Sequence, residues 1–387
     1  MASEALPPLL AALGASSVVG PAVLCLMNTQ DTRALRQVHP VLRDVVTAVP
    51  WNACKAPVVD VVRWRAALPA AVGGNVVVRR PPTADEIAAL VGLAALYVDA
   101  RNSAGVRDGF VAALPAATLT SLATPSAHGI TPAVSYAHLT VLAVLNVGYC
   151  AVDDAVLRTL PPSLVGLNIA CCRRVTRAAT FSHLPALASL EASATKLGDH
   201  AIASLSPTTL HTLELSGTGA TASAPFSRLG ALTTLDISFT PAVVPSVLTS
   251  LPQGLVSLTL TIGADAGPTV DLRHLAALTT LMVTVPEEDP PVSGTRLHLP
   301  PSTTSLIATF DATCDDSDGL LLANATELVA LREVFVSGIG VTARFLQHLP
   351  PSVVRLTVAD YTTGSDVAAA VHTLLQARDE RDIKLYT

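Results

Sequence analysis

Aromatic side chains are scarce in this sequence. Only 4% of its 387 residues are Phe, Trp or Tyr, although 50% are hydrophobic. Alanine, leucine, valine and threonine therefore supply most of the residues that can be buried. This composition suits many thin, similar layers better than one bulky core, and the length allows one long domain or two ordinary ones.

An excess of positive charge is also missing. The formal net charge is −6 at pH 7, with 24 Lys and Arg against 30 Asp and Glu. Proteins that bind nucleic acid generally need a basic patch to neutralise phosphates. We therefore expect no nucleic-acid partner.

No Cys-x-x-Cys pair occurs in the chain. Its cysteines are scattered: Cys25, Cys54, Cys150, Cys171, Cys172 and Cys314. That distribution indicates free thiols in a reducing compartment rather than a disulfide framework. It predicts a cytoplasmic protein, with the nucleus as an alternative.

A positively charged leader is lacking as well. The apolar run over residues 7–27 imitates a signal peptide or a membrane segment, but only Met-Ala-Ser-Glu and two further residues precede it. Gly14, Gly20 and Pro21 interrupt the run, and Pro21 would break a spanning helix. We expect neither secretion nor membrane insertion.

What the sequence does contain is a repeat. The frame L-x-x-L-x-L recurs at intervals of 22 or 23 residues, and its first leucine falls at Leu119, Leu142, Leu164, Leu187, Leu210, Leu232, Leu255 and Leu278. Looser copies begin at Leu93, Thr303, Leu331 and Val353, which makes about twelve units. Chance does not produce such constant spacing.

The physical meaning of one unit follows from its apolar pattern. Alternating residues such as Leu213 and Leu215 predict a short strand with one buried side. A turn and a helical stretch follow, as over 153–160 or 198–205, and the expected N-caps are Asp153, Thr176 and Asp199. One unit cannot bury its apolar face alone, so neighbours stack. The result is an α/β solenoid with a parallel sheet on the concave side and helices outside.

The stretches "LNVGYCAVDDAVL" (145–157) and "LNIACCRRVTRAA" (167–179) resemble the cysteine-containing class of leucine-rich repeats. The resemblance covers roughly residues 85 to 365 and implies a leucine-rich-repeat horseshoe of about 12 repeats. Cys150 and Cys172 hold the cysteine position of that class, which later units fill with threonine at Thr195, Thr218 and Thr240. In the family this side chain turns inward and meets backbone groups of the neighbouring coil.

This substitution pattern bears on the paired cysteines. Because threonine replaces Cys172 in successive units, we interpret Cys172 as a packing residue rather than a redox or metal site. Cys171 falls one place earlier and is expected to be more exposed, with Arg173 and Arg174 close by. A role for the Cys171 thiol stays open.

Residues 20–51 resemble an F-box, which implies docking to a Skp1–cullin-type ubiquitin-ligase scaffold. The match rests on "ALRQVHPVLRDVV" and on Pro21, Leu24, Leu35, Val38, Leu42 and Trp51. The segment departs from the family because Gly20 replaces the opening leucine, the usual acidic residue is absent and His39-Pro40 replaces a small–basic pair. The alternative is a helical cap that shields the first apolar layer of the solenoid.

These readings divide the chain into four parts. We expect a helical F-box-like domain over 1–60, a connector with a first degenerate repeat over 61–92, leucine-rich repeats over 93–364 and a capping helix over 365–387.

One column of residues points to solvent from the concave face. It reads Asn146, Asn168, Glu191, Glu214, Asp236, Thr259, Met282, Ile307, Phe335 and Thr357. Neighbouring strands lie ~4.8 Å apart, so three carboxylates stack in a row before an apolar patch. Adjacent like charges are destabilising unless something compensates them, as a basic peptide or a cation would.

This column is the predicted partner-binding site, apart from its two threonines. A flanking hydroxyl column, Ser193, Ser216, Ser238, Thr261 and Thr284, is expected to bond an extended peptide. The alternative is an ordinary solvated sheet face. A catalytic carboxylate pair fits poorly because an open sheet offers no pocket that excludes water.

Signatures of catalysis are absent. The sequence holds no phosphate-binding loop, G-x-G-x-x-G, H-E-x-x-H or G-x-S-x-G. His138, His183, His274 and His348 occupy one repeat position, expected on the outer helices and too far apart to share a metal. "NAT" at Asn324 would be a glycosylation acceptor only in a secreted chain.

The sequence thus predicts a protein-binding solenoid that is not an enzyme, holds no cofactor or metal and is monomeric by itself. The first hypothesis is a substrate-recognition adaptor of a Skp1–cullin-type ubiquitin ligase, with the target protein on the concave face. The second is a stand-alone scaffold whose N-terminal helices only cap the repeats.

Overall fold

The computed structural model describes residues 47–98, 105–286, 295–311, 320–338, 341–359 and 382–386, together with Val367 and Ala370. The chain divides into two compact units, an N-terminal unit (Met1–Arg174) and a C-terminal unit (Val175–Thr387).

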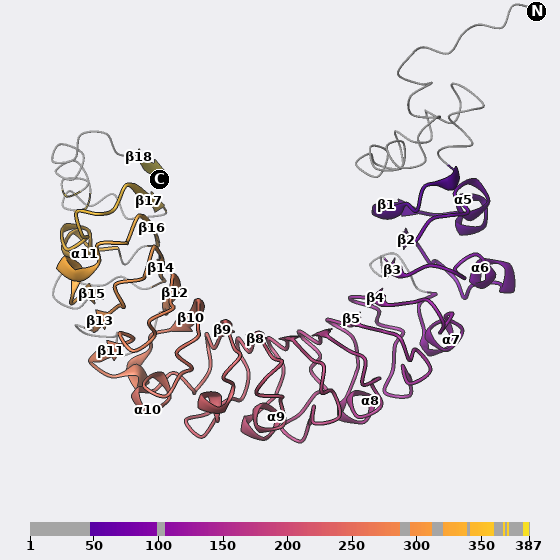
Figure 1. The fold of residues 1–387 in the computed structure, drawn as a ribbon, viewed down its shortest axis with the longest axis horizontal. Helices are drawn as coiled ribbons and strands as arrows, with labels where there is room; N and C mark the ends of the chain where they lie inside the picture. Colours follow the sequence, from indigo (N-terminus) through magenta and orange to yellow (C-terminus); the bar gives the residue numbers. More distant parts are fainter. Residues whose placement is uncertain are drawn as a thin grey trace, which may run out of the picture. The chain divides into compact units, whose positions relative to one another are not determined.

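The N-terminal unit contains six parallel strands that follow one another in chain order. They are β1 (Asn52–Val58), β2 (Gly73–Val76), β3 (Ala95–Val98), β4 (Ser121–Ala123), β5 (Val144–Asn146) and β6 (Gly166–Asn168). The four described helices of this unit all lie on one side of these strands, and no described helix lies on the opposite side (Figure 1). They are α5 (Val61–Ala67), α6 (Ala84–Ala88), α7 (Asp108–Ala112) and α8 (Asp154–Leu157).

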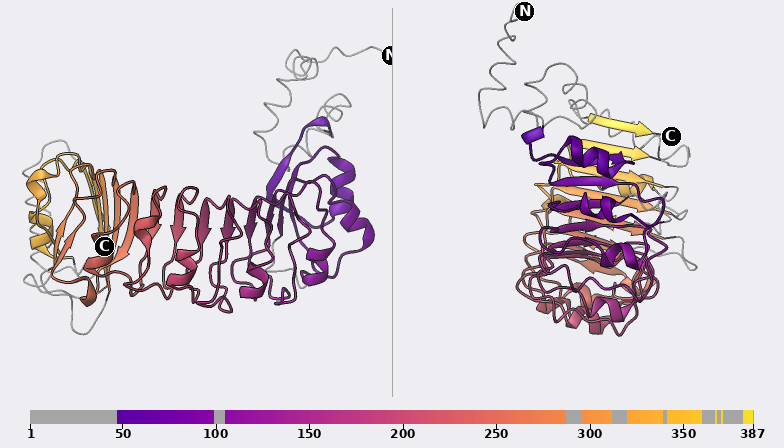
Figure 2. Two further views of the ribbon diagram at one scale, coloured as in Figure 1. Left: turned by 60° about the horizontal axis from the view of Figure 1, so that its bottom comes forward. Right: turned by 90° about the vertical axis from the view of Figure 1, so that its right-hand side faces the viewer.

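The C-terminal unit is built in the same way but adds a second sheet. Its main parallel sheet contains β7 (Ser189–Glu191), β8 (Thr212–Glu214), β9 (Thr234–Asp236), β10 (Ser257–Thr261), β12 (Thr280–Val285), β14 (Ser305–Phe310), β16 (Glu333–Ser337), β17 (Arg355–Ala359) and β18 (Asp382–Tyr386). The second sheet contains β11 (Thr269–Asp271), β13 (Arg296–His298) and β15 (Leu321–Leu322). Figure 2 shows the strands of this unit stacked side by side, and Figure 1 shows β11, β13 and β15 on the same side of the main sheet as α10 (Pro245–Leu248) and α11 (Ala343–Gln347).

Helices are short in the C-terminal unit. They are α9 (Asp199–Ala203), α10 (Pro245–Leu248) and α11 (Ala343–Gln347), and the 3-10 turns are η2 (Phe226–Arg228), η3 (Ala264–Ala266) and η4 (Ala325–Glu327). In neither unit do the described residues include a helix long and apolar enough to cross a lipid bilayer.

The predicted repeat is confirmed strand by strand. Each of the twelve units supplies one strand, from β3 to β10 and then β12, β14, β16 and β17. The eight regularly spaced frame leucines, from Leu119 to Leu278, are at most 1% exposed. The N-terminal and the C-terminal unit are each therefore a leucine-rich-repeat solenoid, in which every coil buries its apolar side against its neighbours.

Hydroxyl groups fasten successive coils to one another. Where the residue before the first frame position is Ser or Thr, its hydroxyl donates to a backbone carbonyl one coil earlier, as Ser163 does to Leu142 at 2.7 Å. Ser302 donates in the same way to Leu278 at 2.9 Å. These bonds satisfy buried carbonyl groups that no strand or helix pairs.

A left-handed residue follows each three-residue strand of the main sheets, β4 to β9. Six successive coils place it at Ser126 (φ 61°), Tyr149 (φ 63°), Cys171 (φ 58°), Ala194 (φ 55°), Gly217 (φ 66°) and Phe239 (φ 53°). The turn ends the strand after three residues. In the coil after Phe239, Thr261 still belongs to β10, and Ile262 donates to the Thr284 carbonyl at 2.9 Å. From β10 onward the main-sheet strands therefore run five or six residues.

The ends of the sheet differ from the expected domain pattern. Strand β1 occupies part of the region expected to be helical, and Trp51 (2% exposed) forms a core cluster with Val49 and Leu68. Pairing with β2 explains this, because a sheet edge imposes extended structure on a short ambiguous segment. The other F-box-like residues, Pro21, Leu24, Leu35, Val38 and Leu42, lie outside the described residues.

The C-terminal end differs as well. Val367 and Ala370 are helical and buried, as a capping helix requires, but 382–386 form β18 and pair with β17 in parallel. A capping helix over all of 365–387 is therefore wrong for the last five described residues. The exposed edge of β17 offers ladder hydrogen bonds that a helix could not use.

The expected helix caps are only partly correct. Asp153 caps α8 and accepts from Ala155 N at 3.0 Å. The N-cap of α9 is Gly198 instead of Asp199, whose carboxylate accepts from Thr221 N (2.8 Å) and Thr221 Oγ1 (2.6 Å) in the next coil. Thr176 precedes a turn rather than a helix and accepts from Ala178 N at 3.1 Å.

Candidate partner-binding site

The predicted solvent-facing column exists in the structure. In the C-terminal unit the strand register aligns Glu191, Glu214, Asp236, Thr259, Met282, Ile307, Phe335 and Thr357 in one continuous row. In the N-terminal unit Asn146 aligns with Asn168. All ten side chains are half-buried or exposed, which is what an open sheet face requires.

The acidic row, defined as Glu191, Glu214 and Asp236, lies on β7, β8 and β9. Glu214 is central, and its pKa is raised by burial and then by the charges of Glu191 and Asp236. Burial removes water from the carboxylate, and ionising Glu214 also adds a third negative charge between two others. A cationic group placed on this row would offset the repulsion between these charges.

Asp236 is held in place by the turn that follows its strand. Its Oδ1 accepts from Ser238 N at 2.8 Å and from Ser238 Oγ at 2.6 Å. The Ser238 hydroxyl also lies 2.9 Å from the Ser216 hydroxyl. The carboxylate is therefore fixed in direction, which lowers the entropy lost when a partner binds it.

The flanking hydroxyl column is only partly available. Ser238 is 5% exposed and Thr261 is 8% exposed, and Thr261 Oγ1 accepts from Phe239 N at 3.0 Å. These two hydroxyls stabilise the turns and cannot bond a partner, contrary to the expectation. Ser193, Ser216 and Thr284 are half-buried and remain at the surface.

The apolar patch, defined as Met282, Ile307 and Phe335, lies on β12, β14 and β16. Met282 and Phe335 are each 38% exposed, and Ile307 is half-buried between them. Large apolar side chains gathered on one sheet face are unusual where no partner covers them.

The two asparagines have a structural task. Asn146 Oδ1 accepts from Gly148 N, and Asn168 Oδ1 accepts from Ala170 N, both at 3.0 Å. Each amide closes the turn after its own strand. Their place in the column is confirmed, and their role in binding stays a prediction.

The cysteines behave as the packing interpretation predicts. Cys150 Sγ donates to Thr124 O at 3.3 Å and Cys172 Sγ to Val147 O at 3.2 Å, each in the preceding coil. Burial raises the pKa of Cys150 to about 11 and that of Cys172 to about 12, which makes both thiols unreactive. Cys171 is half-buried and free.

Asn324 does not offer a glycosylation site. It is 6% exposed, accepts from Leu299 N at 3.1 Å and donates to Leu299 O at 2.8 Å and to Glu327 Oε2 at 3.0 Å. The amide joins two coils of the C-terminal unit.

The four repeated histidines lie in turns rather than on helices. The described part of the chain contains no cluster of three or more His, Cys, Asp or Glu side chains that could hold a metal.

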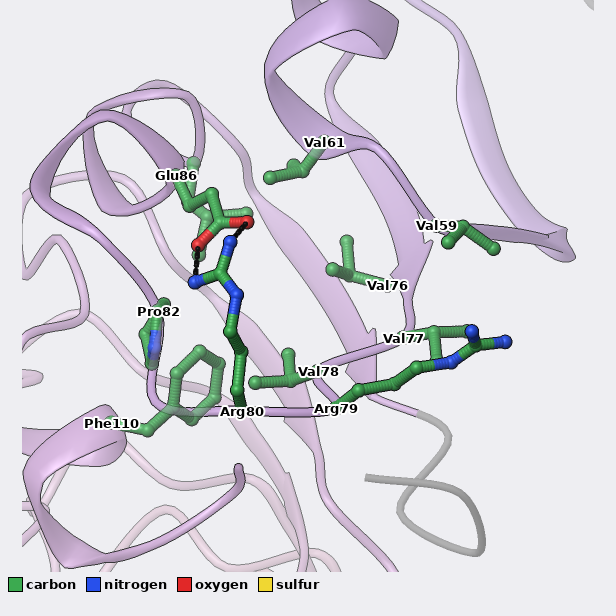
Figure 3. Close-up of a pocket in the computed structure, with 11 residues that line it drawn as sticks. Val59, Val61, Val76, Val77, Val78, Arg79, Arg80, Pro82, Glu86 and Phe110 are labelled. Atoms are coloured by element: carbon green, nitrogen blue, oxygen red, sulfur yellow. Dashed lines mark hydrogen bonds and ion pairs between the residues drawn. The ribbon is translucent and has the colours of Figure 1, made fainter. Parts of the chain in front are cut away.

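An apolar pocket of about 160 Å³ in the N-terminal unit escaped the sequence analysis (Figure 3). Five of its eleven lining residues are valines. Arg80 and Glu86 form a two-pronged ion pair at its edge, with both N–O distances 3.0 Å. Glu86 also closes the capping box of α6 with Thr83, whose backbone N–H lowers the Glu86 pKa. Both charges are thus used to hold the start of α6.

Comparisons with known proteins add distant likeness only. No protein-family model matches the chain, and no curated protein sequence matches it. A Listeria monocytogenes internalin structure is 14% identical with a TM-score of 0.47, over 99% of this chain and 98% of that one. A Leptospira interrogans leucine-rich-repeat protein is 13% identical with a TM-score of 0.44, over 82% of this chain and 91% of that one.

A third similar structure is an octameric complex of latrophilin 3, Unc5D and the leucine-rich-repeat protein FLRT2. Its matching chain is 13% identical with a TM-score of 0.36, over 71% of this chain and 85% of that one. At this distance the likeness carries no function. The coils themselves, with their leucine frame and parallel strands, identify the fold of this chain as a leucine-rich-repeat solenoid.

Proposed function

We propose that this protein is a non-enzymatic scaffold that binds another polypeptide through the exposed face of the C-terminal sheet. The observation that carries the proposal is one aligned column in which the acidic row is followed by the apolar patch. A basic segment relieves the repulsion within the row, and an apolar side chain of the same segment gains a hydrophobic anchor.

The spacing of the strands defines the partner further. Asp236 and Met282 are two strands apart, and Asp236 and Phe335 are four strands apart. At ~4.8 Å per strand these separations are about 10 Å and about 19 Å. An extended peptide advances ~3.3 Å per residue, so its basic and apolar residues would be about three to six positions apart.

A binding role suits this face better than catalysis does. The column lies on an open sheet face. None of its carboxylates lines either of two pockets found in the described part of the chain. Catalytic sites usually need a concavity that excludes water. A shallow charged and apolar surface is instead typical of protein interfaces.

Peptide binding tests the proposal. A fluorescent peptide with two lysines four positions before a leucine should bind the full chain, and Glu214→Lys with Asp236→Lys should weaken binding at least tenfold. Asp265→Lys with Asp311→Lys replaces two exposed acids outside the column, changes the net charge by the same amount and serves as the control. Unchanged affinity in the Glu214→Lys/Asp236→Lys variant would disprove the proposed surface.

The narrower proposal is an adaptor of a Skp1–cullin-type ubiquitin ligase in the cytoplasm or nucleus. It is supported by the F-box-like pattern of residues 20–51 and by the pairing of that pattern with leucine-rich repeats. The alternative is a scaffold without a ligase partner.

A truncation separates these two possibilities. It should remove residues 1–46 and keep Val49, Trp51 and β1, because these belong to the core of the first coil. An adaptor should recover a Skp1-like protein from a lysate, and the truncated chain should lose it while melting at the same temperature. Failure of the full chain to recover a Skp1-like protein favours the stand-alone scaffold.

A further inference from the structure

A second surface of the C-terminal unit is formed by the Thr176–Ala178 segment, which precedes β7, and by the turns that follow β7 and β8. This basic cleft has a volume of about 680 Å³, and its lining includes Arg177, Lys196, Thr195 and the Gly217–Gly219 turn. No acidic residue is among the described residues that line it. The partner-binding column uses none of these side chains.

Arg177 is held in an extended position across two coils. A Cβ atom on Gly198 would lie 3.2 Å from Arg177 Cγ, and a Cβ atom on Gly219 would lie 3.3 Å from Arg177 Nε. Glycine at both places lets the aliphatic part of the arginine rest on one coil and its guanidinium on the next. A ligand therefore meets an arginine that is already oriented.

No carboxylate of the described residues pairs with the positive charges of the cleft. Neither Arg177 nor Lys196 takes part in an ion pair with a described residue. Asp199 is adjacent to Gly198, but its two oxygens accept from Thr221 N at 2.8 Å and Thr221 Oγ1 at 2.6 Å. The nearest carboxylate along the chain is thus committed to the next coil.

Thr218 supplies an independent indication of a ligand. It lines the cleft, is 6% exposed, and its hydroxyl has no hydrogen-bond partner among the described residues. Its counterparts Thr195 and Thr240 donate at 2.7 Å to carbonyls three residues earlier in their own coils. A buried hydroxyl without a partner is destabilising, so a group that supplies an acceptor is favoured here.

We propose that the basic cleft binds a phosphate monoester, whose oxygens are contacted by Arg177 and Lys196 and, after its side chain rotates toward the cleft, by the Thr218 hydroxyl. A phosphate monoester carries ≈ −1.5 to −2 charges at pH 7 and three acceptor oxygens, which match two cations and one hydroxyl donor. The arginine fork suits two of those oxygens. A carboxylate has one charge and two oxygens and would leave one cation or the hydroxyl unmatched.

Calorimetric titration of the full chain tests this site. The probes are O-phosphoserine, inorganic phosphate, the peptide Gly-Ala-phosphoserine-Ala-Gly and its unphosphorylated form, all at one ionic strength because salt screens exposed charges. The phosphorylated probes should bind and the unphosphorylated peptide should not. Arg177→Gln and Lys196→Gln should each weaken binding about tenfold or more.

Three further variants separate a built site from general positive charge. Gly198→Ala should weaken binding although it changes no charge, because every atom near the added Cβ belongs to Arg177. Thr218→Val should weaken binding while raising the melting temperature. Arg296→Gln removes an exposed arginine on β13 and should leave binding unchanged. A phosphopeptide that binds more tightly than O-phosphoserine identifies a phosphorylated polypeptide as the source, and equal binding identifies a small phosphate ester.

The proposal is overturned if the wild-type chain binds none of the phosphorylated probes. It is also overturned if Arg177→Gln and Lys196→Gln bind like the wild type, or if Arg296→Gln weakens binding as much as they do.

Discussion

Replacing Asn324 by alanine should destabilise the C-terminal unit severely. The Asn324 amide accepts from the backbone N–H of Leu299 and donates to the Leu299 carbonyl one coil away. Leu299 is fully buried, so no water replaces the lost partner. Alanine leaves both backbone groups of Leu299 unsatisfied.

The size of the effect follows from those two groups. Each buried polar group without a partner is destabilising by ≈ 1–3 kcal/mol, so the two unsatisfied groups of Leu299 should make Asn324→Ala less stable by about 2–6 kcal/mol. Asn324→Asp keeps the acceptor for Leu299 N but loses the donor and places a carboxylate near Glu327 Oε2, which now lies 3.0 Å from the amide. Asn324→Asp should therefore be at least as harmful at pH 7 and recover in part as the pH falls.

The assay should report on the C-terminal unit. Both tryptophans, Trp51 and Trp64, belong to the N-terminal unit, so fluorescence would miss the change. Far-UV circular dichroism on heating, with amide hydrogen exchange at Leu299, measures it directly. Thr326→Ala is the matched control, because it destroys the same Asn-Ala-Thr triplet but alters an exposed side chain. Equal melting temperatures for Asn324→Ala and Thr326→Ala would refute the reasoning.

Three further predictions concern thiols, carboxylates and caps. In the native protein at pH 8, iodoacetamide should label Cys171 long before Cys150 or Cys172. Burial raises the pKa of Cys150 to about 11 and that of Cys172 to about 12, so both thiols stay protonated. Peptide mass spectrometry measures the labelling, and equal labelling of the three cysteines would contradict this prediction. Glu214→Gln should stabilise the protein at pH 7 by about 0.2–1 kcal/mol. The Glu214 pKa is raised in the folded state, so this gain should vanish as the pH falls below the ordinary range of a glutamate; a gain that persists at pH 3 in urea titrations would contradict the cause. Asp153→Ala should lose about 1 kcal/mol by removing the cap of α8, and an unchanged urea midpoint would count against the cap.

The sequence predicted the repetitive part of the fold well because one physical rule applies twelve times. The leucine frame sets which side of each strand is buried, and strand register then follows, so the alignment of Glu191, Glu214 and Asp236 could be deduced without coordinates. The task of Cys172 could be deduced in the same way from the threonines of later coils.

The features that the sequence did not predict depend on contacts between coils, and the sequence of a single repeat does not specify such contacts. The sequence of its own coil predicts Asp199 as an N-cap, but its carboxylate accepts hydrogen bonds from Thr221 of the next coil. Segments 52–58 and 382–386 become strands because a sheet edge is beside them. The basic cleft also went unnoticed, because Arg177, Lys196 and Thr218 come from three successive coils and form no motif. A basic residue facing glycines 21 and 42 positions later is the signal that could have revealed it.

The change in strand length within the C-terminal unit has a mechanical consequence. Strands β7 and β8 align three residues, whereas β12 and β14 align six, so the second ladder resists separation by about twice as many hydrogen bonds. A force pulling the coils apart opens the short-stranded end first. The acidic row lies on this compliant end and the apolar patch on the stiff end. A polypeptide bound to both the acidic row and the apolar patch would connect the two ends, and would transfer force from the coils with few ladder hydrogen bonds to the coils with many.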